Sequence, residues 1–384
     1  MNKEIFQIIK KTIGSPPKVL HEPYLDINDE KEVLRSVRST FVSTVGKRVI
    51  DLENELKKFL NSKYVLCLNS GTSALHISLK LLGADEGTEI MMPSLTFVAS
   101  ANSVIYNKAD PYFIDVNQDD YGLNPETITN EIEKNFIKNG KTLINKKTKK
   151  KLIAIMPVHV FGIPSNMKEI MKIAKKYNLS VIEDAADSLG SKYRNKQTGT
   201  FGKIGVFSFN GNKTITSGSG GAIVTNEKKI YLKAKHLISV SKKNHSYEFI
   251  HDQVGWNYRM NNLNASLGLS QMKKLNKILR LKKKIAYKYK KAFSGSKYCE
   301  IINSDQVSEL NNWINLLKIK DKYNKKKNNL LNFLVKKGFF CRAIWRPMHL
   351  LPYLKNYQRS QMKNTMKLYR NTICLPSSAN LLIK

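Results

Sequence analysis

The chain has 384 residues, 41% of them apolar, which is enough for a large domain with a smaller companion. Its net charge of +35 comes mainly from lysines spread along the whole chain, with no zinc-finger, RNP or KH signature, so we expect no specific nucleic-acid partner. No uncharged apolar run reaches about 18 residues, the N-terminus lacks an apolar signal segment and the four cysteines lack metal spacing, which predicts a cytoplasmic protein without a membrane span or a metal site.

The N-terminal part of the chain predicts a lead followed by two helices. Residues 1–20 form a short basic lead. Residues 26–39 have the spacing of an amphipathic helix, with Asp29 as a candidate cap and an apolar face formed by Val33, Leu34 and Val37. A second helix is predicted over 43–61, where apolar residues again recur at helical spacing.

A strand, a small-residue turn and a helix follow one another over residues 63–83. The apolar run 63–70 predicts a short strand, and 71–83 predicts the helix that begins directly after it. The first N–H groups of a helix lack internal partners and point outward, so this layout suits a bound phosphate.

From residue 89 onward, strands alternate with helices. Strands are predicted over 89–94, 110–116, 151–158, 179–184, 204–210 and 221–226. Helices are predicted over 96–107, 124–135 and 165–178. This alternation implies an α/β fold in which helices cover both faces of a mostly parallel sheet. Ligands of such sheets bind beyond the carboxyl ends of the strands.

A lysine-rich insertion and a C-terminal module complete the chain. Residues 136–151 are polar and predict an exposed hairpin or loop. A long helix from about residue 261 leads into a module with strand-like and helical segments. We therefore expect a lead over 1–20, a large domain over 21–275, and a helical connection with a small C-terminal domain over 276–384.

Two residues carry the strongest chemical signal. Asp184 and Lys213 each lie just beyond an apolar, strand-like run. In pyridoxal phosphate (PLP) chemistry a lysine amine condenses with the cofactor's aldehyde, while an acid keeps the pyridine nitrogen protonated so that the ring can accept electrons. The positions of these two residues suit that chemistry.

Six segments together resemble the DegT/StrS family of PLP-dependent nucleotide-sugar aminotransferases. In the family's order they are CLNSGTSALH (67–76), 93–116, PVHVFGIP (157–164), 181–226, 255–271 and WRPMHLLP (345–352). The resemblance covers about residues 20–384. It implies the fold of a fold-type-I PLP aminotransferase, with a large PLP-binding α/β domain and a smaller C-terminal α+β domain.

The resemblance also implies roles for individual residues. Lys213 and Asp184 would be the catalytic pair, within a cofactor site formed by Thr72, Ser73, Phe97, Asp184, Asp187, Ser208, Lys213 and Asn257. Asn257 would reach the phosphate in the neighbouring subunit, which implies a homodimer with shared active sites. Asp187 departs from the Gln or His of many relatives, and Ser219 from their Glu. Candidates for substrate contacts are His159, Arg259, Trp345, Arg346 and His349, although His159 also fits a buried structural histidine.

The implied reaction moves an amino group from L-glutamate, through PLP and its pyridoxamine phosphate form, to the C4 ketone of a nucleotide-linked 4-keto-6-deoxy sugar for bacterial surface glycans. The insertion at 136–151 resembles that of the subgroup acting on UDP-2-acetamido-2,6-dideoxy-hexos-4-ulose. A GDP-perosamine synthase-like enzyme is the alternative. A related sugar dehydratase would carry His in place of Lys213. A catalytically dead scaffold with a nucleic-acid-binding or regulatory role is the alternative of another class, and the intact Asp184, Ser208 and Lys213 argue against it.

Overall fold

The computed structural model describes residues 1–302 and 308–383, which build a large mixed sheet with helices on both faces. The strands of this sheet are β1 (Tyr64–Leu68), β2 (Thr88–Pro93), β3 (Asp110–Ile114), β4 (Phe136–Asn139), β5 (Thr142–Asn145), β6 (Lys151–Ile155), β7 (Ser180–Asp184), β10 (Ile204–Ser208) and β11 (Gly221–Thr225). Their order is β1-β11-β10-β7-β6-β2-β3, with the β4–β5 hairpin beside β6. Strands β10, β7, β6, β2 and β3 run parallel, whereas β11 pairs antiparallel with β1 and β10. The α/β fold predicted from the sequence is confirmed.

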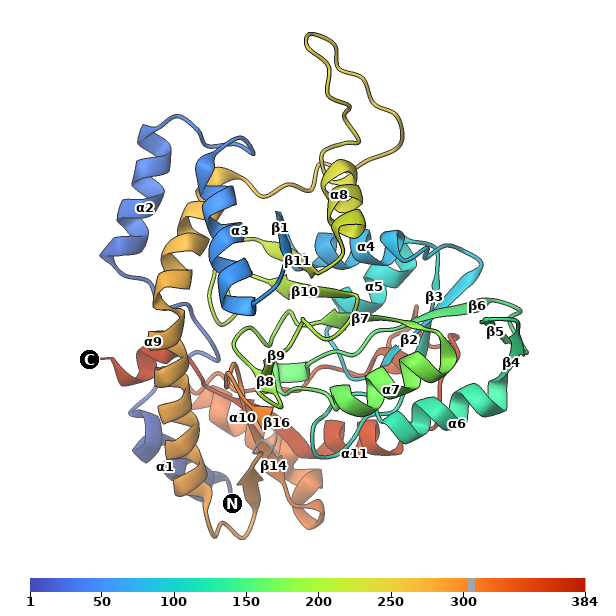
Figure 1. Ribbon diagram of the computed structural model, residues 1–384. Coiled ribbons are helices and arrows are strands. Elements are labelled where there is room, and N and C mark those ends of the chain that lie inside the picture. The colour runs from blue at the N-terminus through green and yellow to red at the C-terminus, as the bar shows by residue number, and fades with distance from the viewer. Residues whose placement is uncertain (303–307, 384) are drawn as a thin grey trace.

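Two layers of helices enclose the sheet (Figure 1). One layer consists of α4 (Gly71–Leu81), α5 (Val98–Tyr106) and α8 (Lys228–Leu237). The other consists of α3 (Lys47–Leu60), α6 (Pro125–Asn135), α7 (Met167–Tyr177) and the first half of α9 (Asn262–Phe293). Strand β1 shows why both faces are covered, since Leu66 and Leu68 enter the first core while Val65 and Cys67 enter the second. Among the described helices, none is long and apolar enough to cross a membrane.

The C-terminal module has its own core. It contains the antiparallel sheet β12-β14-β16-β15, formed by Cys299–Ile301, Asn315–Ile319, Thr372–Leu375 and Arg342–Ala343. Helices α10 (Lys327–Lys336) and α11 (Lys363–Asn371) flank it, and a three-stranded sheet joins β13 (Ser308–Glu309) to β8 (Lys192–Tyr193) and β9 (Lys196–Gln197). The N-terminal segment 1–20, expected to be a short basic lead, contains a helix. Residues Asn2–Ile13 form helix α1, whose Ile5, Ile9 and Ile13 enter this core beside the second half of α9.

Helix α2 (Ile27–Arg38) buries a different face from the one predicted. Its cap is Asp26 rather than Asp29, and Asp29 completes a capping box by accepting a hydrogen bond from the Asp26 N–H. The predicted apolar face stays outside, with Leu34 44% and Val37 51% exposed. The polar face is buried instead, because α9 supplies a lysine partner: Lys274 pairs with Asp29. An apolar stripe therefore remains uncovered in the single chain.

The insertion at 136–151 forms the β4–β5 hairpin, as expected from its sequence. Asn145 is buried and its side-chain amide donates to Glu89 Oε2 at 2.8 Å, while the Thr148 hydroxyl donates to Glu89 Oε1 at 2.5 Å. Glu89 lies near the start of β2, and the hairpin pairs with the start of β6 at Lys151 and Leu152. The hairpin therefore lies at the amino ends of these strands, away from the carboxyl ends where ligands are expected.

Candidate active site

A cavity of about 310 Å³ lies at the carboxyl ends of the central parallel strands. Asp184 ends β7 and Ser208 ends β10, and the first residues of α4 and α5 form the adjoining wall. The cavity contains more than half of the site residues predicted from the sequence, namely Thr72, Phe97, Asp184, Asp187, Ser208, Lys213 and Trp345. The fold thus brings together residues that are as far as 273 positions apart in the chain, from Thr72 to Trp345.

One end of the cavity is an anion-binding corner at the start of α4. Ser70 caps this helix, because its hydroxyl accepts from the Ser73 N–H at 3.0 Å. The N–H groups of Gly71 and Thr72 then remain at the open helix end, beside the Ser208 hydroxyl. A Cβ on Gly71 would lie 2.9 Å from the Ser208 Cβ, so only glycine lets the helix approach β10 this closely. Backbone donors, a hydroxyl and a helix N-terminus together suit a phosphate.

Asp184 is held in one orientation by neutral donors. The Ser100 hydroxyl donates to Asp184 Oδ2 at 2.7 Å, and the Ala186 N–H donates to Oδ1 at 3.1 Å. Ser100 in turn lies 2.8 Å from the Thr96 hydroxyl. The carboxylate is 4% exposed and borders the cavity, so it can face a ligand there without freely rotating.

Lys213 is a buried amine with a carboxylate partner. It lies in the turn after β10, where its N–H donates to Asn210 O at 3.0 Å, and its side chain is 12% exposed. Its Nζ is 2.5 Å from Asp187 Oδ1. Burial raises the pKa of Asp187, and the adjacent Lys213 ammonium opposes that shift. The pair therefore places a proton donor and a proton acceptor side by side at the cavity wall.

Aromatic rings close the side of the cavity that faces the C-terminal module. The ring centroids of Trp345 and Phe161 are 4.4 Å apart and stacked, and Trp345 lies 5.8 Å from Phe97 and 6.3 Å from Trp313. The Trp313 indole faces Lys213, with Nζ 4.6 Å from the ring centroid. This wall limits the access of water to the lysine.

The residues around this cavity fit PLP. The corner at α4 supplies the donors that a phosphate dianion requires, Asp184 supplies a carboxylate for a pyridinium nitrogen, and Lys213 supplies a primary amine. Because Gly71 has no Cβ, the start of α4 lies directly beside Ser208, so backbone N–H groups and a hydroxyl face the same corner of the cavity.

Three predicted residues lie beside the cavity instead of lining it, and of these His159 and His349 are buried and Ser73 is partly buried. Both ring nitrogens of His159 are engaged, since Nε2 lies 3.0 Å from Glu183 Oε2 and Nδ1 accepts from the Ser165 N–H at 3.1 Å. His349 Nδ1 lies 2.6 Å from the Ser94 hydroxyl, and burial lowers the pKa of this histidine. Ser73 is engaged by the capping residue Ser70. These side chains are engaged in hydrogen bonds within the protein, so they stabilise the residues around the cavity and do not face a ligand.

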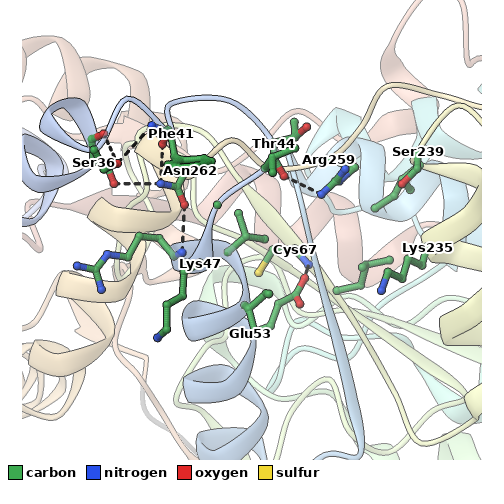
Figure 2. Close-up of a pocket in the computed structure, with 18 of the residues that line it drawn as sticks. Ser36, Phe41, Thr44, Lys47, Glu53, Cys67, Lys235, Ser239, Arg259 and Asn262 are labelled. Carbon is green, nitrogen blue, oxygen red and sulfur yellow. Dashed lines mark hydrogen bonds between the residues drawn. The ribbon is translucent and has the colours of Figure 1, made fainter. Parts of the chain in front are cut away.

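Three further predicted residues lie away from the cavity. Arg259 borders a second cavity of about 790 Å³, where Figure 2 shows it near Thr44 and on the same side as Lys235. Its Nη2 donates to Thr44 O at 2.6 Å. Burial raises the pKa of Glu53, which borders the same cavity, to about 7. Arg346 and Asn257 are exposed. Residues 239–256 form a long segment that projects beyond α8 (Figure 1), and Asn257, which directly follows this projecting segment, pairs with Ser239 at its start.

The sequence missed two residues that shape the site. Trp313 is a lone tryptophan 100 positions after Lys213, in a segment without a recognised motif, and only the fold brings the two together. Ser100 could have been found, because it lies three positions after Phe97 at the start of α5 and therefore on the next turn of that helix.

Comparison with known proteins identifies relatives along nearly the whole chain. The model of the DegT/DnrJ/EryC1/StrS aminotransferase family matches residues 23–382. The GDP-perosamine synthase of Escherichia coli O157:H7 is 34% identical over 341 residues, which cover 88% of each protein. The UDP-4-amino-4,6-dideoxy-N-acetyl-β-L-altrosamine transaminase of Helicobacter pylori is 31% identical over 365 residues, covering 94% of this chain and 92% of that protein.

Solved structures give the same picture of the fold. PseC of Helicobacter pylori, an aminotransferase involved in the biosynthesis of pseudoaminic acid, superposes with a TM-score of 0.86 at 28% identity. The superposition covers 96% of this chain and 95% of that protein.

Proposed function

The chain belongs to the DegT/DnrJ/EryC1/StrS aminotransferase family, and on that premise we propose that it transfers the amino group of L-glutamate to the C4 ketone of UDP-2-acetamido-2,6-dideoxy-hexos-4-ulose. It has the mixed α/β fold of the fold-type-I PLP aminotransferases. The observation that carries the proposal is the convergence of Lys213, Asp184 and the open end of α4 on one cavity. A scaffold without catalytic function would have no need to keep an amine, a carboxylate and an anion-binding corner together.

The residues of the cavity divide the work of binding and orientation. PLP, when bound, supplies an electron sink for the carbon that exchanges its amino group. Thr72 and Ser208 would hold the phosphate, and Asp184 would hold a proton on the pyridine nitrogen through a charge-assisted hydrogen bond. Phe97, which borders the cavity, would pack on the ring face.

Lys213 would attach the cofactor and then move a proton with its free Nζ. Its partner Asp187 positions that nitrogen at the cavity wall through the 2.5 Å contact. Asp187 occupies a position where many relatives have Gln or His, and its contact with Lys213 supports a role for this carboxylate in the site. It orients the amine and balances its charge.

The nucleotide and the sugar are the finer part of the proposal. Relatives named for GDP-perosamine and for a UDP-linked altrosamine are 34% and 31% identical to the chain, so identity alone favours neither substrate strongly. The 136–151 hairpin resembles that of the UDP-sugar subgroup. The hairpin lies at the opposite end of the strands from the cavity, so it would not contact the substrate. It supports the UDP-sugar assignment only as a feature shared with that subgroup.

A direct comparison of the two substrates tests this assignment. Purified protein with PLP and L-glutamate is given either the UDP-linked ketosugar or GDP-4-keto-6-deoxymannose, and kcat/KM is measured from 2-oxoglutarate release. We expect the UDP substrate to be at least about tenfold better. A preference for the GDP substrate would replace our assignment with the GDP-perosamine synthase-like alternative.

A homodimer with shared active sites is part of the proposal. The single chain leaves large apolar side chains in solvent, with Phe41 57%, Val45 64%, Tyr247 81% and Phe249 79% exposed. Tyr247 and Phe249 belong to the projecting segment, residues 239–256, and Asn257 directly follows it. A second copy is the occupant that would cover these side chains and bring Asn257 to a phosphate site.

The domain boundary is likewise proposed to lie within α9. The core of the large domain includes Leu275 and Ile278 of this helix, whereas Ile285 and Tyr289 belong to the core of the C-terminal module. The core changes between residues 278 and 285, a few residues after the expected boundary between a large domain over 21–275 and a helical connection with a small domain over 276–384. Helix α1 packs into the core of the small domain from the N-terminal side.

A further inference from the structure

Trp313 lines the cavity although no recognised motif of the sequence contains it, and several contacts define its position. It is 4% exposed and comes from the small domain, directly before β14. Its indole face lies against Lys213, with Nζ 4.6 Å from the ring centroid. Because Asp187 contacts the same nitrogen at 2.5 Å, the amine is held between a carboxylate and an aromatic face.

Trp313 is held by three hydrogen bonds, one from its indole and two at its backbone. Its Nε1–H donates to Asn212 O at 2.6 Å, which ties the ring to the residue next to Lys213. Its backbone N–H donates to Asn311 Oδ1 at 2.9 Å, and its backbone carbonyl accepts from Lys282 Nζ at 3.1 Å. Asn311 is itself bonded to Asp187 O at 2.8 Å and to Thr214 Oγ1 at 3.1 Å. The same hydrogen-bond network therefore contains Trp313 and the residues on either side of Lys213, Asn212 and Thr214.

Lys282 is an amine deep in α9 with no role in the proposed reaction. It is 1% exposed, donates to Ser377 O at 2.8 Å and lies 2.7 Å from His21 Nε2. No carboxylate pairs with it in the part of the chain that the structure describes. Burying a lysine without a counter-ion costs folding free energy. We therefore infer that Lys282 is kept for its hydrogen bonds to the backbone carbonyls of Trp313 and Ser377.

We propose that Trp313 is a positioning residue for Lys213, because its indole face holds the Lys213 amine at the cavity wall, and that buried Lys282 holds Trp313 in place through the Trp313 backbone carbonyl. This inference rests on the proposed role of Lys213. Attraction between an ammonium and an aromatic face changes an equilibrium roughly two- to thirtyfold, which is enough to decide where a flexible lysine spends its time. Trp313 would accordingly affect kcat, through the position of the amine, more than KM for the sugar.

Two substitutions separate this role from simple filling of space. Trp313→Phe keeps an aromatic face, whereas Trp313→Leu keeps an apolar side chain without one. We expect kcat of the Phe variant to stay within about threefold of wild type and that of the Leu variant to fall about tenfold or more, with KM for the ketosugar changed less than about threefold in both. A space-filling role would make the two variants alike, and that result would overturn the proposal.

Fluorine NMR tests the contact without relying on activity. The full-length protein, without added PLP, is labelled with 5-fluorotryptophan and its three signals are assigned by single Trp→Phe substitutions. Lys213→Met and Lys282→Met should each shift the Trp313 signal and leave that of Trp256 in place, because Trp256 packs on His76 with ring centroids 5.2 Å apart. A Trp313 signal that ignores Lys213→Met would overturn the proposal even if the Leu variant failed to fold.

The activity assay and the fluorine signal distinguish loss of the proposed function from loss of the positioning role. If the wild-type enzyme aminates no ketosugar, the proposed function is lost while the fluorine result still reports whether Trp313 holds Lys213. If the enzyme is active but the Trp313 signal is insensitive to Lys213, only the positioning role is lost.

Discussion

Lys213 differs from the other lysines of this strongly basic chain in its surroundings. Its side chain is 12% exposed, whereas that of Lys203, before the same strand, is 41% exposed. It contacts the Asp187 carboxylate and an indole face. A lysine held in this way is out of reach of most solvent and oriented toward a ligand cavity, as a nucleophilic amine requires.

Removal of this amine should abolish transamination while the fold survives. We expect Lys213→Ala to bind PLP without the absorbance band of a lysine-bound cofactor and to show no measurable amino transfer, because attachment and proton movement are lost together. Absorbance spectra and 2-oxoglutarate release provide the measurement, with Lys203→Ala as the control that keeps both. Wild-type turnover by Lys213→Ala would contradict the assignment.

Among individual residues, the sequence predicts those side chains that end a strand or begin a helix. Asp184, Ser208 and Thr72 are of this kind, and the cavity contains all three. Trp313 could not be predicted, because its closeness to Lys213 depends on how the small domain packs on the large one. His159 was predicted as a candidate for substrate contact because it lies within a family motif. Both of its ring nitrogens are instead engaged with Glu183 and Ser165, which the sequence does not reveal.

At the scale of secondary structure, periodicity predicts a helix but not the surface that covers it. The position of α2 agrees with its sequence, yet the face it buries is the polar one, because α9 provides a basic partner. Helix α1 was missed although Ile5, Ile9 and Ile13 recur at helical spacing, and the second half of α9 lies beside the face that they form. The long helix α9 was predicted, whereas the burial of its Lys282 was not.

The buried lysine of α9 predicts a pH dependence of stability. Burial lowers the pKa of Lys282 to about 7, whereas a lysine in the unfolded chain titrates near 10.4. Between these values the unfolded state binds more protons, so the free energy of unfolding contributed by Lys282 rises with pH, by at most about 1.4 kcal/mol per pH unit. Burial lowers the pKa of the neighbouring His21 below its ordinary value near 6.5, so His21 stays neutral in this window.

Urea unfolding of wild type and Lys282→Met at pH 7, 8 and 9 measures this contribution. Other groups titrate alike in both proteins, so we expect the stability of wild type relative to the variant to increase steadily from pH 7 to 9. Lys283→Met, at an exposed neighbouring position, should show no such trend. A constant difference between wild type and Lys282→Met would mean that Lys282 keeps its ordinary pKa in the folded protein.

At the scale of the whole molecule, the single chain looks incomplete. Apolar side chains of α2 and of the projecting segment are in solvent, and Asn257 lies outside the cavity of its own chain. The sequence predicts amphipathic helices and family motifs, but it does not predict which apolar faces are buried within the single chain. Only the folded structure shows which apolar side chains remain exposed. Both features agree with an enzyme that works as a pair of subunits.

Mixing two defective chains tests the shared site. Lys213→Ala and Asn257→Ala subunits should each be impaired, and after subunit exchange at equal amounts about a quarter of the sites should carry neither lesion and regain activity. A chain with both substitutions, mixed with Lys213→Ala, is the control that cannot recover. No recovery after verified exchange, or a fully active monomer in sedimentation, would contradict the arrangement.

The proposed reaction moves the amino nitrogen of glutamate onto C4 of a nucleotide-linked ketosugar, and an isotope label can follow that nitrogen from donor to product. The wild-type protein is incubated with PLP, ¹⁵N-labelled L-glutamate and the UDP-linked 4-keto sugar, and the sugar nucleotide is analysed by mass spectrometry and NMR. We predict that ¹⁵N appears at C4 of the sugar, and that no label appears with Lys213→Ala. A sugar nucleotide that stays unlabelled with both the UDP and the GDP ketosugar, in the presence of bound PLP, would contradict the account.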